Sequence, residues 1–324
     1  MTAGLVAIAG HREAMTRLRG FLAEDRLPHA LIFCGPSGIG KATVARALTA
    51  ALFCRSQTRD DDVGCGTCGP CLKVRENHHP DYVQVELLPE KTRISVDQIR
   101  EVCGFLALTP LEARLKVALI DDAALMNEAA ANALLKTLEE PSAGTLLILS
   151  TSRPGSLLPT IRSRCQVMRF FPLQREELLQ VARQTPTLAG IDGETLEEAI
   201  YLAEGSASRL LQLCTGELKD YIKRFRTDMD NLPQRHLADL CVTAAYWGDR
   251  ERFPFAQTFL MAWFRDRIQA TISGWRTEGS ETRVLNLIRK SRDLFAQAEE
   301  FNLNRQMVLE TLFIHLARWQ GASF

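Results

Sequence analysis

The chain has 324 residues, of which 46% are hydrophobic and 24% charged, and its 39 basic and 39 acidic side chains leave a formal net charge of zero. This composition is typical of a globular protein with two or three domains, and the apolar runs are too short to span a membrane. Because the N-terminus lacks a basic, apolar leader and the chain lacks a basic tail, we expect a cytoplasmic protein without strong autonomous binding to nucleic acid.

Short apolar runs alternate with amphipathic stretches through about the first 170 residues, which predicts a parallel α/β sheet. Strands are expected at residues 30–34, 83–87, 117–120 and 146–149. Helices are expected at residues 41–53 and 128–139, and a third follows a capping box at Ser95. After about residue 172 the chain reads as helices alone, near 174–184, 194–203 and 206–214, followed by about five more. The predicted fold class is α/β followed by all-α.

Residues 35–41 read Gly-Pro-Ser-Gly-Ile-Gly-Lys and fit the phosphate-binding pattern G-x-x-x-x-G-K between a predicted strand and a predicted helix. In such a loop the glycines let backbone N–H groups surround the phosphates, and the lysine reaches the β- and γ-phosphates. The glycines and the lysine that would do this here are Gly35, Gly38, Gly40 and Lys41. The next residue, which ordinarily supplies a hydroxyl to Mg²⁺, is Ala42.

Thr43 does not simply replace the missing hydroxyl, because one residue along a helix rotates a side chain by about 100°. Its own contact would be with the α-phosphate. We therefore expect nucleotide binding through the loop backbone and Lys41 to survive better than hydrolysis.

Asp121 and Asp122 follow a predicted buried strand on the C-terminal side of this loop. An aspartate in such a place holds Mg²⁺ in P-loop ATPases, often through water. The next residue is usually a glutamate that orients the attacking water, and Asp122 is one methylene shorter. Because a positional error near 1 Å can cost about a hundredfold in rate, Asp122 should position water badly. The alternative is that both aspartates merely cap the next helix.

Four of the nine cysteines cluster in the sequence, at Cys54, Cys65, Cys68 and Cys71. In a reducing compartment such spacing indicates a metal site before a disulfide. Four thiolates leave no open coordination position, so the pattern favours a closed structural Zn²⁺ site. The alternatives are buried unligated cysteines, a redox pair or an iron–sulfur cluster. His78 and His79 are competing ligands, although the turn-like sequence around them favours surface or capping histidines.

Ser163-Arg164-Cys165 follows the last predicted strand of the α/β region. A lone arginine on a loop is usually a solvated charge. Arginine is also the side chain that reaches across an interface to stabilise phosphate charge, and spacing alone leaves both readings open for Arg164.

Taken together, these motifs resemble the AAA+ clamp-loader family of bacterial DNA polymerase III across essentially the whole chain. Residues 132–141 (Asn-Ala-Leu-Leu-Lys-Thr-Leu-Glu-Glu-Pro) look like the signature helix of that family, and residues 157–165 resemble its Ser-Arg-Cys segment. The resemblance implies an AAA+ P-loop domain at residues 1–171 with a zinc module at about 54–71, a helical lid at 172–217 and a helical collar domain at 218–324.

The resemblance also implies roles for single residues. Arg164 matches the arginine finger that reaches ATP on an adjacent γ/τ subunit, and Thr151 falls at the sensor position after the strand. Residues 205–209 (Gly-Ser-Ala-Ser-Arg) match the second sensor region only loosely, so Arg209 is either a nucleotide contact or a solvated helix charge.

Within the family, Ala42, Asp122 and the lack of a long C-terminal extension resemble the stator subunit rather than the γ/τ motor. The implied partners are γ/τ and δ subunits, the sliding clamp and, indirectly, primed DNA, with no membrane. Such a subunit of a DNA-directed DNA polymerase (a nucleotidyltransferase) holoenzyme would carry structural Zn²⁺, bind ATP and Mg²⁺ weakly or not at all, and lack ATPase activity of its own. An active γ/τ-type ATPase is the alternative, whereas a P-loop kinase would explain neither the C-terminal helices nor the Ser-Arg-Cys segment.

Overall fold

The computed structural model describes residues 8–24, 26–56, 64–89, 91–214, 218–273, 280–300 and 303–319. The chain divides into two compact units, of which the first comprises Met1–Gly190 and Glu204–Arg209 and the second comprises Ile191–Ala203 and Leu210–Phe324. The boundaries expected after residues 171 and 217 stay predictions, since compactness alone does not define where a domain begins. Residues 57–63 of the expected zinc module lie outside the described residues.

The first unit is built on one sheet of five parallel strands in the order β2-β3-β4-β1-β5. The strands are β1 (Ala30–Cys34), β2 (Tyr82–Val85), β3 (Lys116–Ile120), β4 (Thr145–Thr151) and β5 (Gln166–Arg169). Strands β1 and β3 are buried along their whole length, as expected for a parallel sheet that is covered on both faces. The α/β prediction for this region is confirmed.

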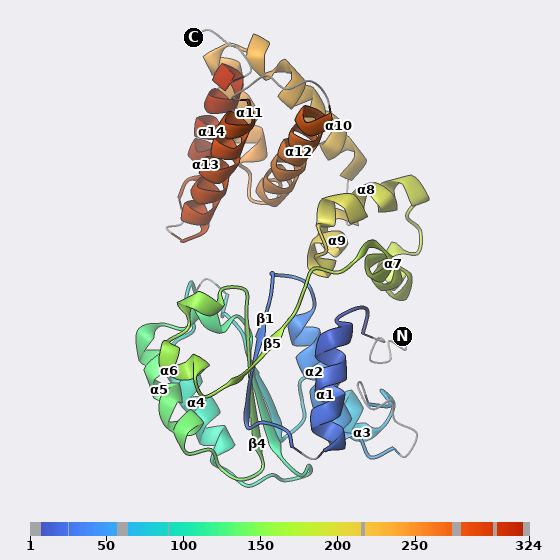
Figure 1. The fold of residues 1–324 in the computed structure, drawn as a ribbon, viewed down its shortest axis with the longest axis vertical. Helices are drawn as coiled ribbons and strands as arrows, with labels where there is room; N and C mark the ends of the chain where they lie inside the picture. The colour runs from blue at the N-terminus through green and yellow to red at the C-terminus, as the bar shows by residue number, and fades with distance from the viewer. Residues whose placement is uncertain are drawn as a thin grey trace. The chain divides into compact units, whose positions relative to one another are not determined.

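Helices cover both faces of this sheet, α1, α2 and α3 on one side and α4, α5 and α6 on the other (Figure 1). Their bounds are α1 (Arg12–Ala23), α2 (Lys41–Phe53), α3 (Gly69–Arg75), α4 (Val96–Leu106), α5 (Glu128–Glu139) and α6 (Pro159–Arg162). Successive residues of β1 enter different cores, with Leu31 and Phe33 facing the first group of helices and Ile32 facing the second. The period of two along the strand produces this division.

Local capping fixes where two of these helices begin. Ser95 Oγ accepts a hydrogen bond from Gln98 N, and Gln98 Oε1 accepts one from Ser95 N, which confirms the predicted capping box of α4. Asn127 Oδ1 likewise accepts from Ala130 N at 2.8 Å at the start of α5.

A buried carboxylate holds the loop between α4 and β3 against the sheet. Asp81 is fully buried and accepts hydrogen bonds from three consecutive backbone N–H groups, those of Leu111, Glu112 and Ala113, at 2.7–2.8 Å. It also pairs with the buried Lys116 ammonium at 3.2 Å. Burial by itself would raise the pKa of Asp81, but these four donors outweigh it and hold the pKa at about 2.

After β5, every element in the described part of the chain is a helix, as predicted. The helices are α7 (Arg175–Gln184), α8 (Gly193–Ala203), α9 (Ala207–Cys214), α10 (Leu218–Asn231), α11 (Leu237–Trp247), α12 (Phe253–Ser273), α13 (Ser280–Glu300) and α14 (Arg305–Trp319). In the second unit the buried Trp247 ring lies among Phe225 and Phe259, and its Nε1–H donates to Asp228 at 2.8 Å. None of the described helices is both long and apolar enough to cross a bilayer.

Candidate functional site

The phosphate-binding loop lies between the end of β1 and the first residue of α2. Gly35 N donates to Thr151 O at 3.2 Å, so the loop begins hydrogen-bonded to the end of β4. Lys41 is the first residue of α2 and is buried, with 7% of its surface exposed. Its Nζ donates to Gly35 O at 2.9 Å and Pro36 O at 2.7 Å. The loop therefore holds its lysine with its own carbonyl groups.

The charge on Lys41 is balanced by the two carboxylates after β3. Burial lowers the pKa of Lys41, and Asp121 and Asp122 oppose that shift. Ser150 on β4 connects the pair, because its hydroxyl donates to Asp121 Oδ1 and accepts from Asp122 N. Strands β3 and β4 are neighbours, so their ends meet at this site.

Asp122 has an uncommon backbone and an unpaired carboxylate oxygen. Its φ is 50°, and it precedes a short 3₁₀ turn without capping it through its side chain. Among the described residues no group donates a hydrogen bond to the buried Asp122 Oδ1. Burial raises the pKa of Asp122, Asp121 adds to the rise, and Arg153 and Lys41 oppose it. The alternative that this carboxylate merely caps the next helix is therefore wrong.

Loop, helix and carboxylates surround one cavity of about 340 Å³. It is lined by Ser37, Gly38, Gly40, Lys41, Ala42, Thr43, Arg46, Asp121, Asp122, Ser150, Ser152 and Ser208. Six of the residues expected to bind nucleotide thus come together there: Gly38, Gly40, Lys41, Thr43, Asp121 and Asp122. Its volume is within the range of small-molecule sites.

Two of the expected nucleotide-binding residues, Gly35 and Thr151, do not line the cavity. Gly35 contributes its carbonyl to Lys41 instead. The Thr151 side chain is fully buried and its Oγ1 accepts from Arg153 N at 3.0 Å, whereas its neighbours Ser150 and Ser152 line the cavity. Alternation along β4 explains the difference, since adjacent residues of a strand point to opposite faces.

Ala42 lines the cavity directly, so the methyl group stands where the sequence pattern places a hydroxyl. Arg46 lies one helical turn further along α2 and also lines the cavity. Sequence reasoning missed Arg46, although its spacing of four residues from Ala42 places both on one helix face.

The first residues of α9, with Ser206 just before them, close one side of the loop. Ser208 N donates to Gly38 O at 2.9 Å. Gly38 has a φ of +74°, and a Cβ there would lie 2.3 Å from Ser206 Oγ, so glycine is required both by backbone and by space. Ser208 lines the cavity, whereas Arg209 pairs with Glu204 at 3.3 Å. Of the two readings of Arg209, the helix charge agrees better with this geometry.

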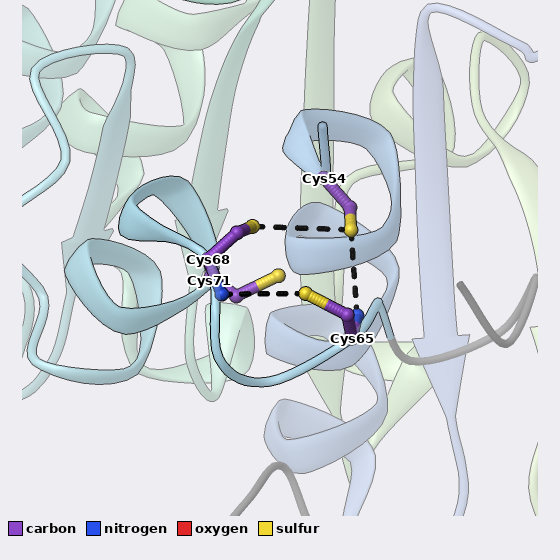
Figure 2. A group of neighbouring side chains, drawn as sticks. All are labelled: Cys54, Cys65, Cys68 and Cys71. Carbon is purple, nitrogen blue, oxygen red and sulfur yellow. Dashed lines mark hydrogen bonds between the residues drawn. The ribbon is translucent and has the colours of Figure 1, made fainter. Parts of the chain in front are cut away.

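The four predicted metal ligands converge at the other end of α2. Cys54 directly follows α2, Cys65 and Cys68 lie on the next described segment, and Cys71 is buried in α3. Figure 2 shows the four side chains pointing toward a common centre, and their sulfur atoms all lie within 4.8 Å of one another. A tetrahedral zinc with Zn–S distances of about 2.3 Å places its sulfur atoms about 3.8 Å apart. The 3.9 Å between Cys54 Sγ and Cys68 Sγ agrees with that geometry.

Hydrogen bonds within the cysteine cluster favour thiolates. Cys65 N donates to Cys54 Sγ at 3.4 Å, and Cys68 N donates to Cys65 Sγ at 3.3 Å (Figure 2). The Thr67 backbone and hydroxyl, followed by Cys68 N–H, lower the pKa of Cys65 to about 5. Burial instead raises the pKa of the Cys71 thiol, a cost that a coordinated cation would offset. The cluster is compatible with a structural zinc.

His79 is not part of this cluster. It is buried, its ring lies 4.5 Å from that of Phe53, and its Nδ1 accepts a hydrogen bond from Asp81 N. His78 is exposed. In the described part of the chain the candidate metal group consists of the four cysteines, so the reading of both histidines as non-ligands agrees with the structure.

Arg164 lies two residues after the short helix α6 and is not among the residues that line the cavity. Its Nη2 pairs with Glu139 Oε1 at 2.9 Å, and its Nη1 donates to Thr160 O at 3.0 Å and to Ser163 Oγ at 3.4 Å. The side chain keeps 35% of its surface exposed. The guanidinium thus has three contacts within the chain, and its side chain is still partly exposed.

Comparisons with known proteins identify a family for this chain. The sequence model of a family described as "DNA polymerase III, delta subunit" matches residues 10–174, half of the chain. The chain is 41% identical over 180 residues to the DNA polymerase III subunit delta′ of Pseudomonas aeruginosa, covering 55% of this chain and 53% of that protein. It is 38% identical over 160 residues to delta′ of Bacillus subtilis, covering 49% and 47%. The chain thus spans about half the length of these relatives.

Subunits with other names match as well. The chain is 32% identical over 171 residues to the tau subunit of Escherichia coli, covering 53% of this chain and 26% of that protein. Among solved structures, a gamma subunit-related protein from Thermotoga maritima aligns over 94% of this chain and 99% of its own, at 18% identity and a TM-score of 0.48. The family match over half of the chain, with delta′ relatives at 38–41% identity, decides the assignment. The chain belongs to the DNA polymerase III delta subunit family, as a protein of the delta′ type.

Proposed function

We propose that this chain is the stator subunit of a bacterial clamp loader, which supports ATP-driven loading of a sliding clamp onto primed DNA. The observation that carries the proposal is Ala42 in the cavity lining, where an ATPase of this fold needs a hydroxyl for Mg²⁺. The relatives named delta′ support a place in the DNA polymerase III assembly.

The cavity is suited to hold a nucleotide better than to hydrolyse one. Gly38, Gly40, Lys41 and Thr43 would contact the phosphates, and Asp121 would hold the metal that accompanies them. Hydrolysis further needs a carboxylate that orients water. Asp122 is one methylene short for that role, so it should position the attacking water badly.

The chemistry that this chain serves takes place in a neighbouring γ/τ-type subunit. Arg164 is exposed enough to reach outside the chain, and a guanidinium in trans stabilises the charge that develops during phosphoryl transfer. The alternating α/β unit then acts as a rigid interface element, and the C-terminal helices as the collar that joins the ring.

A structural zinc held by Cys54, Cys65, Cys68 and Cys71 completes the proposal. Zinc bound by four thiolates lacks an open position and therefore supplies stability rather than chemistry. Such a site suits the reducing cytoplasm, where thiols stay available for metal. We keep the AAA+, lid and collar domains at 1–171, 172–217 and 218–324 as part of this proposal, with γ/τ and δ subunits as partners.

Turnover by the isolated chain tests the proposal. The purified chain is incubated with ATP, Mg²⁺ and primed DNA, and phosphate release is compared with that of the Lys41→Ala variant. A stator gives the same background rate for both proteins. A DNA-stimulated rate that disappears in Lys41→Ala would overturn the proposal.

The second candidate is an active γ/τ-type ATPase. Identity to tau of E. coli and the retained Lys41 with Asp121 favour it. Ala42 and Asp122 weigh against it, and the turnover experiment separates the two candidates.

A further inference from the structure

The Arg164 guanidinium is fixed by groups from two elements. Thr160 O and Ser163 Oγ lie within four residues of Arg164 and belong to the same short segment. Glu139 lies on a different helix and contributes the charged contact, at 2.9 Å. An arginine side chain loses rotamer entropy when it binds a partner. A contact that already holds the guanidinium in place reduces this entropy cost of binding.

Glu139 lies at a position where a negative charge does not stabilise its own helix. It is the last residue of α5, at the negative end of the helix dipole. The preceding Leu138 is buried in the core, which fixes the position of the glutamate backbone. The next residue, Glu140, is also exposed, and no described residue forms a hydrogen bond or ion pair with its carboxylate. The cation that compensates Glu139 is Arg164.

We propose that Glu139 is a positioning residue, which holds the Arg164 guanidinium in the orientation that engages phosphate in the neighbouring subunit. The proposal rests on the function proposed above. A guanidinium has five N–H donors, and three of them are taken by Glu139, Thr160 and Ser163. The Nε–H and one Nη2–H remain for an incoming phosphate oxygen, so the ion pair need not break.

The test uses the complex reconstituted from this chain with its γ/τ and δ partners, and measures kcat and KM for DNA-stimulated ATP hydrolysis. Arg164→Ala defines the share of the rate that depends on the finger. Glu139→Ala should lower kcat of that share about threefold, the scale of a lost exposed ion pair, with little change in KM. Glu139→Gln keeps an acceptor oxygen at the same reach and should restore most of the rate.

Glu140→Ala is the matched control and should leave the rate unchanged. The double variant Glu139→Ala with Arg164→Ala should be no slower than Arg164→Ala alone, because a positioning residue has nothing left to position. Thermal unfolding and gel filtration of each variant check that the chain folds and assembles.

An unchanged or faster rate for Glu139→Ala, in a complex that Arg164→Ala slows, would overturn this inference and leave the stator proposal standing. A complex whose rate is unaffected by Arg164→Ala would instead overturn the finger in the proposed function, and the role of Glu139 with it.

Discussion

Helix α2 connects two candidate ligand sites of opposite character. Its first residue, Lys41, belongs to the phosphate-binding loop, and its last residue is followed directly by Cys54 of the cysteine cluster. The cavity at the N-terminal end has the loop, the lysine and two carboxylates but lacks the hydroxyl that Mg²⁺ requires. The cluster at the C-terminal end has all four thiols that a structural zinc requires.

The comparison separates architecture from chemistry. A closed metal site contributes to folding as soon as its four ligands are present, whereas a hydrolytic site needs every group within a fraction of an ångström. One end of α2 is thus complete for stability and the other incomplete for catalysis. Both properties suit the stator role that we propose for this chain.

The largest effect is expected from removing one ligand of the four-cysteine cluster. In small zinc peptides the metal supplies about 10–16 kcal/mol of folding free energy, so Cys71→Ser should lose zinc and loosen residues 64–76. Metal analysis and hydrogen exchange measure both changes, and Cys241→Ser, outside the cluster, serves as the control. Wild-type protein that contains no zinc after purification in zinc-containing, reducing buffer would contradict the metal assignment.

The second largest effect is expected from removing the Asp81 carboxylate, which holds the loop that contacts α3. Glu112 pairs with Lys73 of α3 and is itself held through its N–H by Asp81. Asp81→Asn leaves the Lys116 ammonium buried without its counter-charge, and losing one partner of a buried pair costs about 3–5 kcal/mol. Urea unfolding measures the loss, with Asp97→Asn on the exposed face of α4 as the control. A loss below about 1 kcal/mol would show that the Asp81 contacts contribute little.

The same carboxylate predicts a pH dependence. The pKa of Asp81 falls from an ordinary value near 3.8 to about 2 on folding. A depressed pKa contributes stability that is present above the unfolded value and is lost as pH falls through the folded one. Between pH 4 and pH 2 wild type should therefore lose about 2 kcal/mol more than Asp81→Asn. Parallel stability profiles for the two proteins would refute this.

A smaller effect is expected from removing the lysine at the incomplete end. A hydrogen bond to a charged group is worth about 1.5–3 kcal/mol, so Lys41→Ala should weaken ADP or ATP binding to the isolated chain by about tenfold to a hundredfold. Calorimetry or a fluorescent nucleotide measures it, and the exposed Lys136→Ala is the control. Equal affinity in Lys41→Ala and wild type would mean that the cavity does not hold phosphate through this residue.

The smallest effect is expected from restoring the missing hydroxyl in the cavity at the N-terminal end of α2. Ala42→Thr restores the hydroxyl and should make nucleotide binding depend on Mg²⁺, with a gain of about 1 kcal/mol, or roughly fivefold. Binding is compared with Mg²⁺ and with EDTA in the same protein. If the gain persists in EDTA, the hydroxyl acts as a simple hydrogen-bond donor and not through the metal.

Local patterns in the sequence predicted much of the fold and part of the site. Short apolar runs identified strands β1, β3 and β4, and alternation at residues 83–87 identified β2, which the structure places at Tyr82–Val85. The Ser95 capping box identified the start of α4, and cysteine spacing identified the four clustered thiols. Strand β5 was missed because its four residues, Gln-Val-Met-Arg, are short and half polar. It becomes a strand by pairing with β1, whose sequence lies far away.

The sequence by itself determined the phosphate-binding loop, the absence of its hydroxyl at Ala42 and the four-cysteine set, because each depends on residue types at short spacing. The tertiary structure decided that Ser150 and Ser208 line the cavity in place of Thr151 and Arg209, and that Glu139 holds Arg164. Those contacts join residues on different elements. Which side chain faces which depends on strand alternation and helix packing, and not on spacing along the chain.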